Sequence, residues 1–151
     1  MAYSTVISAA LSGLDVMPVR VEADVSNGLP MLHMVGYLSS EVKEASERVR
    51  TAIHNAGINL PARKMIVNLA PATVRKKGAL FDLPIAIALL ASLGEIRGET
   101  LEKMMIVGEL GLDGSVQKVS GVLPIVLKAR EIGCRTCIVP MENVTEGALV
   151  S

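Results

Sequence analysis

The sequence predicts a two-layer α+β domain with a mixed sheet and helices packed on it. Residues 18–26 alternate between apolar and polar side chains, which is the period of a half-exposed strand. Residues 39–57 carry apolar side chains at helical spacing. Residues 83–93 form an apolar run that is too short to span a bilayer and is typical of a core helix. Strands and helices that alternate along a chain indicate two packed layers.

The first 36 residues are predicted to form strands. Asn27-Gly28 is typical of a tight turn between antiparallel strands, so residues 31–36 are expected to return beside residues 18–26. A hairpin at the front favours a mixed sheet over a doubly wound parallel one. No GxGxxG motif joins a strand to a helix, so a Rossmann fold is excluded.

An amphipathic helix is predicted next. Ser39 and Ser40 are candidate N-caps with acidic residues close behind, and Gly57 is expected to end the helix. A short strand over residues 64–70 follows.

The helix over residues 83–92 is apolar on every side, so it is expected to lie inside the domain. Asp82 is its predicted N-cap, and Phe81 is predicted to fill the core at the end of the preceding loop. Replacing Asp82 with alanine is then expected to cost about 1 kcal/mol of stability and no specific activity.

The last third of the chain continues the alternation. Residues 104–116 predict a strand, a glycine-rich turn and a second strand. A helix over residues 121–130 is expected to end at Gly133, and residues 136–140 predict a strand. Residues 142–150 predict the start of another helix.

Length and charge limit the classes of function. A chain of 151 residues predicts a single domain with its own core. Lys plus Arg and Asp plus Glu balance at 15 each, so the whole chain has no electrostatic signature of a nucleic-acid or membrane binder, and any basic patch is local. The N-terminus lacks the basic region of a signal peptide, so we expect a cytoplasmic protein without a membrane partner.

The two cysteines form a CxxC motif, Cys134 and Cys137, that follows a helix and leads into a strand. A redox motif would be expected at a helix N-terminus, where the thiolate is stabilised. Zinc would need further ligands, and His33 and His54 lack a matching spacing. We therefore expect reduced, mostly buried thiols and no metal site.

The segment RKKG at residues 75–78 raises the question of catalysis. Basic residues and a glycine before a buried helix would suit a nucleophile held by a lysine base. However, residues 74–91 contain no Ser, Thr or Cys. The chain also has no P-loop and no GxSxG motif. Composition thus argues against catalysis by this loop.

Four segments in the expected order resemble the N-terminal domain of the ComM/YifB proteins, which are bacterial AAA+ ATPases often labelled magnesium-chelatase-like. These segments are NGLPMLHMVG, SERVRTAIHNAGINLPARKMIVNLAPATVRKKGALFDLPIAIALLASLGEI, VGELGLDGSVQKVSGVLP and CIVPMEN. The resemblance implies one Lon-like domain over residues 1–151, with the ribosomal-S5-domain-2-like fold of the Lon proteolytic domain and the RadA C-terminal domain. It also implies an AAA+ ATPase domain beyond the C-terminus. The family usually continues VGLP-Asp where this chain has Tyr37, Leu38 and Ser39.

The resemblance to Lon peptidases can be followed at the catalytic positions. Their loop is similar to KDGPSAG, which aligns its glycine with Gly78 and its nucleophile with Leu80. The position of the Lon lysine base falls on Leu123, while Lys128 lies five residues later and Lys118 precedes the helix. The resemblance therefore implies a scaffold without a Ser-Lys dyad. We expect a non-catalytic domain without a cofactor, with ATP and magnesium bound by the AAA+ domain.

For the family, the resemblance implies a hexameric ring that acts on DNA and promotes branch migration during recombination of incoming DNA. This domain would then assist ring assembly or guide DNA, with its own AAA+ domain and neighbouring subunits as partners. Phosphate contacts need exposed cations. The candidate residues are Arg75, Lys76, Lys77, Arg63 and Lys64.

Other interpretations stay open. The basic loop could be only a solvated turn, because we expect no aromatic stacking platform to accompany it. The high aliphatic and methionine content favours a protein-interaction or oligomerisation module with no DNA role. A residual hydrolase is the third alternative.

Overall fold

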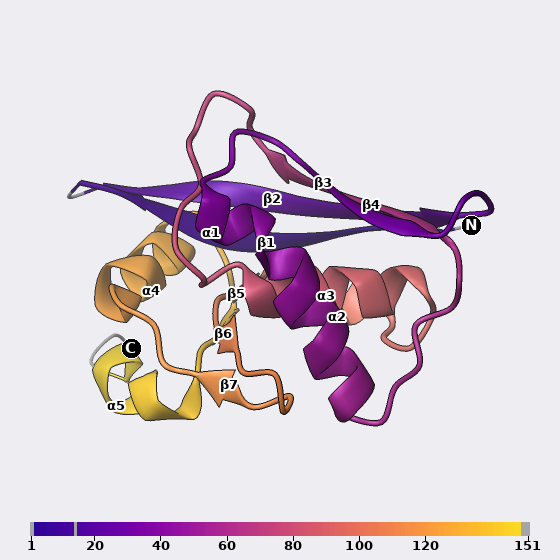
Figure 1. Cartoon of the computed structure of the whole chain (residues 1–151). Helices are drawn as coiled ribbons and strands as arrows, with labels where there is room; N and C mark the ends of the chain where they lie inside the picture. The colour runs from indigo at the N-terminus through magenta and orange to yellow at the C-terminus, as the bar shows by residue number, and fades with distance from the viewer. Residues whose placement is uncertain (1, 14, 149–151) are drawn as a thin grey trace.

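A six-stranded mixed sheet runs across the molecule (Figure 1). The computed structural model describes residues 2–13 and 15–148. In spatial order, the strands are β3 (Met31–Val35), β4 (Lys64–Ala70), β2 (Asp15–Ser26), β1 (Ala2–Ser12), β5 (Met104–Ile106) and β8 (Thr136–Ile138).

The helices form a second layer, which lies below the sheet in Figure 1. The α-helices are α1 (Ser40–Lys43), α2 (Ala45–Asn55), α3 (Asp82–Ser92), α4 (Val122–Glu131) and α5 (Val144–Gly147). Two 3-10 turns, η1 (Gly98–Leu101) and η2 (Met141–Asn143), and a separate hairpin of β6 (Glu109–Leu110) and β7 (Val116–Gln117) complete the fold. The predicted two-layer α+β class is confirmed. Within the described residues, every helix is too short or too polar to cross a membrane.

The hairpin predicted at Asn27-Gly28 is wrong. β2 forms its hairpin with β1, and its other edge pairs antiparallel with β4. β3 lies on the far side of β4 and runs parallel to it. The burial of the two strands gives the reason: β4 buries Met65, Val67 and Leu69 on one face, whereas no residue of β3 is fully buried. β4, with one apolar face fully buried, thus takes the inner position, and β3 takes the edge.

Two predicted helices also differ from the structure. The helix expected over residues 39–57 is divided at Glu44 into α1 and α2, with Ser39 as the N-cap of α1. The amide of Val42 donates to the Ser39 hydroxyl at 3.4 Å. The helix expected over residues 142–150 begins with η2 and continues as α5, and its last two positions lie outside the described residues.

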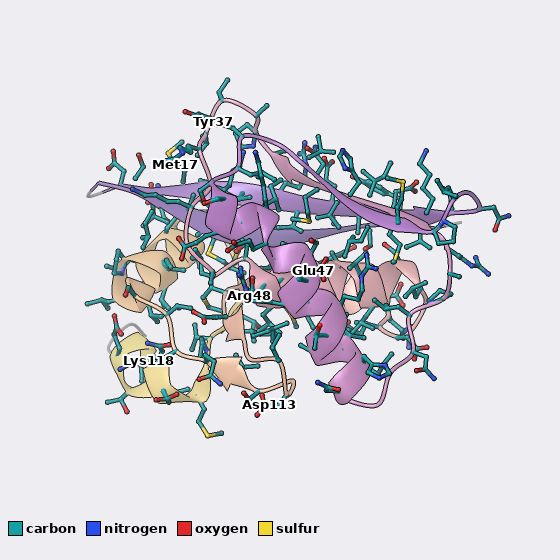
Figure 2. All side chains as sticks on the ribbon, in the orientation of Figure 1. Met17, Tyr37, Glu47, Arg48, Asp113 and Lys118 are labelled. Atoms are coloured by element: carbon teal, nitrogen blue, oxygen red, sulfur yellow. The ribbon has the colours of Figure 1, made fainter. Side chains whose placement is uncertain are left out.

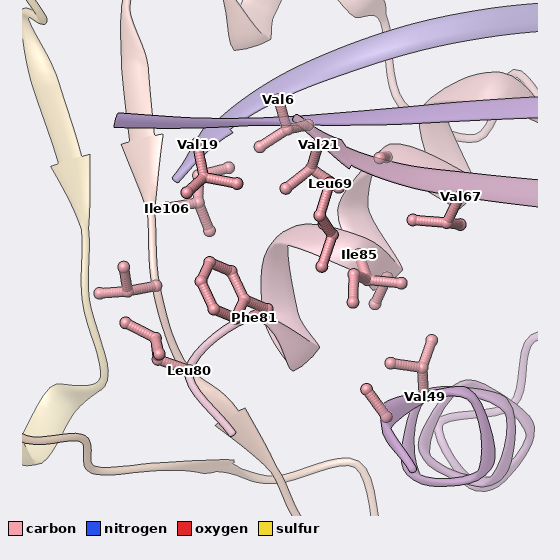
Figure 3. Close-up of a cluster of buried hydrophobic side chains, with 14 of the residues drawn as sticks. Val6, Val19, Val21, Val49, Val67, Leu69, Leu80, Phe81, Ile85 and Ile106 are labelled. Atoms are coloured by element: carbon pink, nitrogen blue, oxygen red, sulfur yellow. The ribbon is translucent and has the colours of Figure 1, made fainter. Parts of the chain in front are cut away.

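The core lies between the sheet and α3. No residue of α3 is exposed, as its apolar sequence predicts. Figure 3 shows the Phe81 ring among Val19, Leu69 and Ile106, which confirms Phe81 as a core residue. Full burial of such a side chain contributes about 1.5–3 kcal/mol. This packing fixes the start of α3 and the loop that precedes it.

Candidate functional site

Hydrogen bonds from Lys76, which is buried, hold the loop over residues 71–79 in place. The backbone amide of Lys76 donates to the Tyr37 carbonyl at 2.9 Å, and the Ser39 amide donates to the Lys76 carbonyl at 2.9 Å. The Lys76 side chain is fully buried, and its ammonium group donates to the Pro71 carbonyl. Burial lowers the pKa of Lys76. The structure therefore removes Lys76 from the predicted DNA contacts, because its charge is turned inward.

Arg75 and Lys77, on either side of Lys76, are exposed. Side chains alternate in an extended segment, so burial of Lys76 directs its two neighbours outward. Leu38 pairs with Lys76 in a parallel bridge, which places Tyr37 beside Arg75 on the outer side.

Tyr37 is 52% exposed and lies above the sheet in Figure 2. We call Tyr37, Arg75 and Lys77 the loop surface. The expectation that no aromatic side chain accompanies the basic loop is corrected, because Tyr37 comes from a segment far away in sequence. The sequence offered one signal for it, the departure from VGLP-Asp at this position.

Arg63 and Lys64 do not belong to the loop surface. Both are half-buried at the start of β4, whereas the loop follows the end of β4. A strand of this length separates its two ends by about 20 Å, and in Figure 1 β4 begins at the right of the molecule and ends near its middle. The five predicted contacts thus divide into two separate groups, Arg75 with Lys77 and Arg63 with Lys64, and the buried Lys76.

A pocket of about 450 Å³ lies between the loop and the segment that leads into α4. Lys77 of the loop surface also borders this pocket, and the other charged residues that line it are Lys118, Glu41 and Glu109. Two lysines and two glutamates give the pocket no excess of either charge. It is therefore a poorer phosphate site than the loop surface above it.

The two positions that align with the Lon Ser-Lys dyad lie in different parts of the structure. Leu80 lines this pocket and is 7% exposed. Leu123 is half-buried on α4, where its amide donates to Glu146 at 3.0 Å. Lys118 and Ser120 also line the pocket, which sequence reasoning missed. Within residues 2–13 and 15–148, no hydrogen bond joins a hydroxyl to a lysine amine.

Asp82 does not cap α3, so that prediction is wrong. Its carboxylate is fully buried and accepts two hydrogen bonds from Arg48, 2.7 Å from Nε and 3.0 Å from Nη2. The backbone amide of Leu110 donates to the same carboxylate at 3.1 Å. Arg48 extends from α2 toward the start of α3 (Figure 2) and also donates to the Glu41 carbonyl. The pair thus joins α1, α2, α3 and β6 beside the pocket.

Electrostatics explain why this pair is structural. Burial raises the pKa of Asp82, and the hydrogen bonds from Arg48 oppose that rise. Hydrogen bonding to Asp82 raises the pKa of Arg48 in turn. Every oxygen of the carboxylate is occupied by a protein donor. Sequence reasoning could not find the pair, because 34 residues separate its members.

The cysteines are free and half-buried. Burial raises the pKa of both thiols, that of Cys137 to about 11. The raised pKa favours the protonated form of both thiols, which are less buried than the sequence predicted. Among the described residues, no group of three or more His, Cys, Asp or Glu side chains is arranged to hold a metal ion.

Comparison with known proteins identifies relatives of this chain. Residues 21–143 match the sequence model of the family described as subunit ChlI of Mg-chelatase. The uncharacterized protein YifB of Salmonella typhimurium is 43% identical over 151 residues, which is 100% of this chain and 30% of that protein. The competence protein ComM of Haemophilus influenzae is 40% identical over the same shares. A Lon protease of Mycolicibacterium smegmatis is 27% identical over 142 residues, 89% of this chain and 18% of the protease. The chain thus spans about 30% of the length of the curated YifB and ComM relatives.

Proposed function

The chain belongs to the family described as subunit ChlI of Mg-chelatase, and we propose that it is a non-catalytic accessory domain that guides single-stranded DNA. The protein to which it contributes would be an AAA+ ATPase of the ComM/YifB type that acts on DNA in recombination during transformation. The likeness to a relative named a competence protein supports this setting.

The loop surface carries the proposal. Arg75 and Lys77 present two cations that can neutralise neighbouring phosphates without reading a sequence. The exposed ring of Tyr37 offers a face on which a base can stack, an interaction worth about 1–3 kcal/mol per base. Bases are free to stack on a side chain only when they leave a duplex, so this combination favours a single strand.

Buried Lys76 makes the surface ready to bind. Its backbone is bonded to Tyr37 and Ser39, and its side chain is bonded to Pro71. The positions of Arg75 and Tyr37 are thereby set before any ligand arrives, which reduces the conformational entropy lost on binding.

The pocket below the loop supports a non-catalytic role. Leucine at position 80 supplies no nucleophile, and leucine at position 123 supplies no base. We propose that the Lon-like scaffold is used here to present the loop surface.

The remaining machinery would come from outside this chain. We propose that the domain works beside its own AAA+ domain, which would use ATP and magnesium, and beside neighbouring subunits of a hexameric cytoplasmic ring. Six loop surfaces in one ring would raise the affinity for a strand well above that of a single copy.

A second candidate is a protein-interaction or oligomerisation module with no DNA role. It is favoured by large apolar side chains that face solvent, with Leu29 79% and Met141 87% exposed. A mass that rises with concentration, together with no affinity for DNA, would favour this candidate over the first.

The proposal is tested with single strands that carry 2-aminopurine, whose fluorescence falls on stacking. We expect binding with quenching, and Tyr37→Ala should weaken binding roughly tenfold, the loss of one stacked base. Tyr37→Phe should behave as the wild type because it keeps the ring. Tyr3→Ala, which removes another exposed tyrosine on β1, is the matched control. The absence of single-strand binding at low salt would refute the DNA role.

A further inference from the structure

A second pocket, at the start of β4, collects basic side chains. It has a volume of about 510 Å³ and lies between α2, the segment that links α2 to β4, and the starts of β3 and β4. Figure 1 shows that segment rising from the end of α2 to β4. Arg50, His54 and Arg63 line this α2 pocket, and no carboxylate does so. It therefore differs from the pocket below the loop surface, where lysines and glutamates balance.

Two of the nitrogen donors in the α2 pocket are uncommitted. Arg50 and His54 lie four residues apart on α2, so their side chains share one face of the helix. Within residues 2–13 and 15–148, neither side chain forms a hydrogen bond or an ion pair with the protein. Arg48, two positions before Arg50 on the same helix, is instead bound to Asp82. The two arginines of α2 thus differ, since Arg48 is bound within the protein and Arg50 lines the pocket.

The rest of the lining is mostly apolar. Met31, Leu60 and Met65 contribute aliphatic and thioether surface, and Asn59 adds an amide. The volume lies within the range of about 300–1,000 Å³ that is usual for small-molecule pockets. An apolar wall beside a cationic rim suits a ligand with a charged end and an aromatic or apolar body.

We propose that the α2 pocket binds a small aromatic phosphate ester of about the size of a nucleoside monophosphate. The phosphate would lie against Arg50 and His54, with Arg63 alongside, and the aromatic body would lie against Met31 and Leu60. Guanidinium groups match phosphate oxygens in a bidentate manner.

This site is independent of the loop surface, because the length of β4 separates the two by about 20 Å. Variants of one site therefore serve as controls for the other. Arg50→Ala and His54→Ala are expected to fold normally, since both side chains are exposed.

The test titrates the chain with AMP, inorganic phosphate and adenosine and follows amide chemical shifts and heats of binding. We expect AMP to bind more tightly than either part alone, with shifts centred on Arg50 and His54. Arg50→Ala should weaken AMP binding roughly tenfold or more, the loss of a charge-assisted hydrogen bond. Arg130→Ala, which removes an exposed arginine on α4, should leave it unchanged.

Three results would overturn the proposal. AMP could fail to bind the wild type at millimolar concentration. It could bind no more tightly than inorganic phosphate, which would reveal only attraction to surface charge. It could also bind equally well to Arg50→Ala and His54→Ala, which would locate it elsewhere. None of these results bears on DNA binding by the loop surface.

Discussion

Removal of the Asp82 carboxylate should cost far more than a helix cap is worth. The side chain is fully buried and accepts hydrogen bonds from Arg48 and Leu110. Asp82→Ala leaves the Arg48 cation, whose side chain is only 22% exposed, without its counter-charge. Breaking a buried pair by removing one partner typically costs about 3–5 kcal/mol. Because Arg48 retains some access to water, we expect about 3 kcal/mol, against about 1 kcal/mol for an N-cap.

A double-mutant cycle separates this explanation from a general loss of packing. Burial disfavours the charge of Asp82 and raises its pKa, so the cost of desolvation offsets part of what the pair contributes to stability. Asp82→Ala and Arg48→Ala should each be costly, and the double variant Asp82→Ala/Arg48→Ala should cost clearly less than their sum. Urea unfolding followed by far-ultraviolet circular dichroism measures all four free energies. The chain has no tryptophan, which makes circular dichroism the better probe.

The reasoning would be refuted by a loss of 1 kcal/mol or less in Asp82→Ala, or by costs that simply add. The first result would restore the capping role, and the second would mean that the two side chains act independently. The expected loss is a large part of the roughly 5–15 kcal/mol that stabilises a typical domain.

Three further predictions concern single residues. Burial lowers the pKa of Lys76, so the unfolded chain holds this proton more tightly than the folded chain does. The free energy of unfolding should therefore rise as the pH increases toward 10.5. Lys76→Met should remove that part of the pH dependence in unfolding curves measured between pH 8 and 10. A slope identical in both proteins would contradict the buried charge. Burial raises the pKa of Cys137 to about 11 and also that of Cys134, so both thiols should react with a disulfide reagent at pH 8 much more slowly than in urea; equal rates would show that they are accessible. Gly36 has φ +135°, and an added Cβ would meet the Leu69 carbonyl oxygen at 2.9 Å, so Gly36→Ala should lower the melting temperature, and an unchanged melting temperature would contradict this backbone geometry.

Local patterns gave the elements of the fold but not their neighbours. Alternation in β2 and the continuous apolar face of α3 depend on adjacent residues, and both predictions were right. The hairpin at Asn27-Gly28 failed because β4, nearly 40 positions later, pairs more favourably with β2 than β3 does. A local turn signal cannot indicate that a strand later in the sequence will pair with β2 in place of β3.

The site shows the same limit. Arg75 and Lys77 were recognisable as cations on a loop, and their exposure follows from the burial of Lys76 between them. That burial depends on Leu38 and Pro71, which composition cannot place. Tyr37 and Arg48 act through partners more than 30 residues away, so their roles emerge only from the folded chain.

Whether the loop surface contacts phosphates is tested most directly by the salt dependence of single-strand affinity. The wild type and Arg75→Ala/Lys77→Ala would be titrated across several salt concentrations. Arg97→Ala/Arg130→Ala, which removes two other exposed arginines, would be the charge-matched control. Each phosphate contact adds about 0.7 to the slope of log affinity against log salt for a single strand, so two lost contacts should reduce it by about 1.4. We predict that reduction in the loop variant and none in the control. Equal slopes in all three proteins would contradict a DNA-guiding loop.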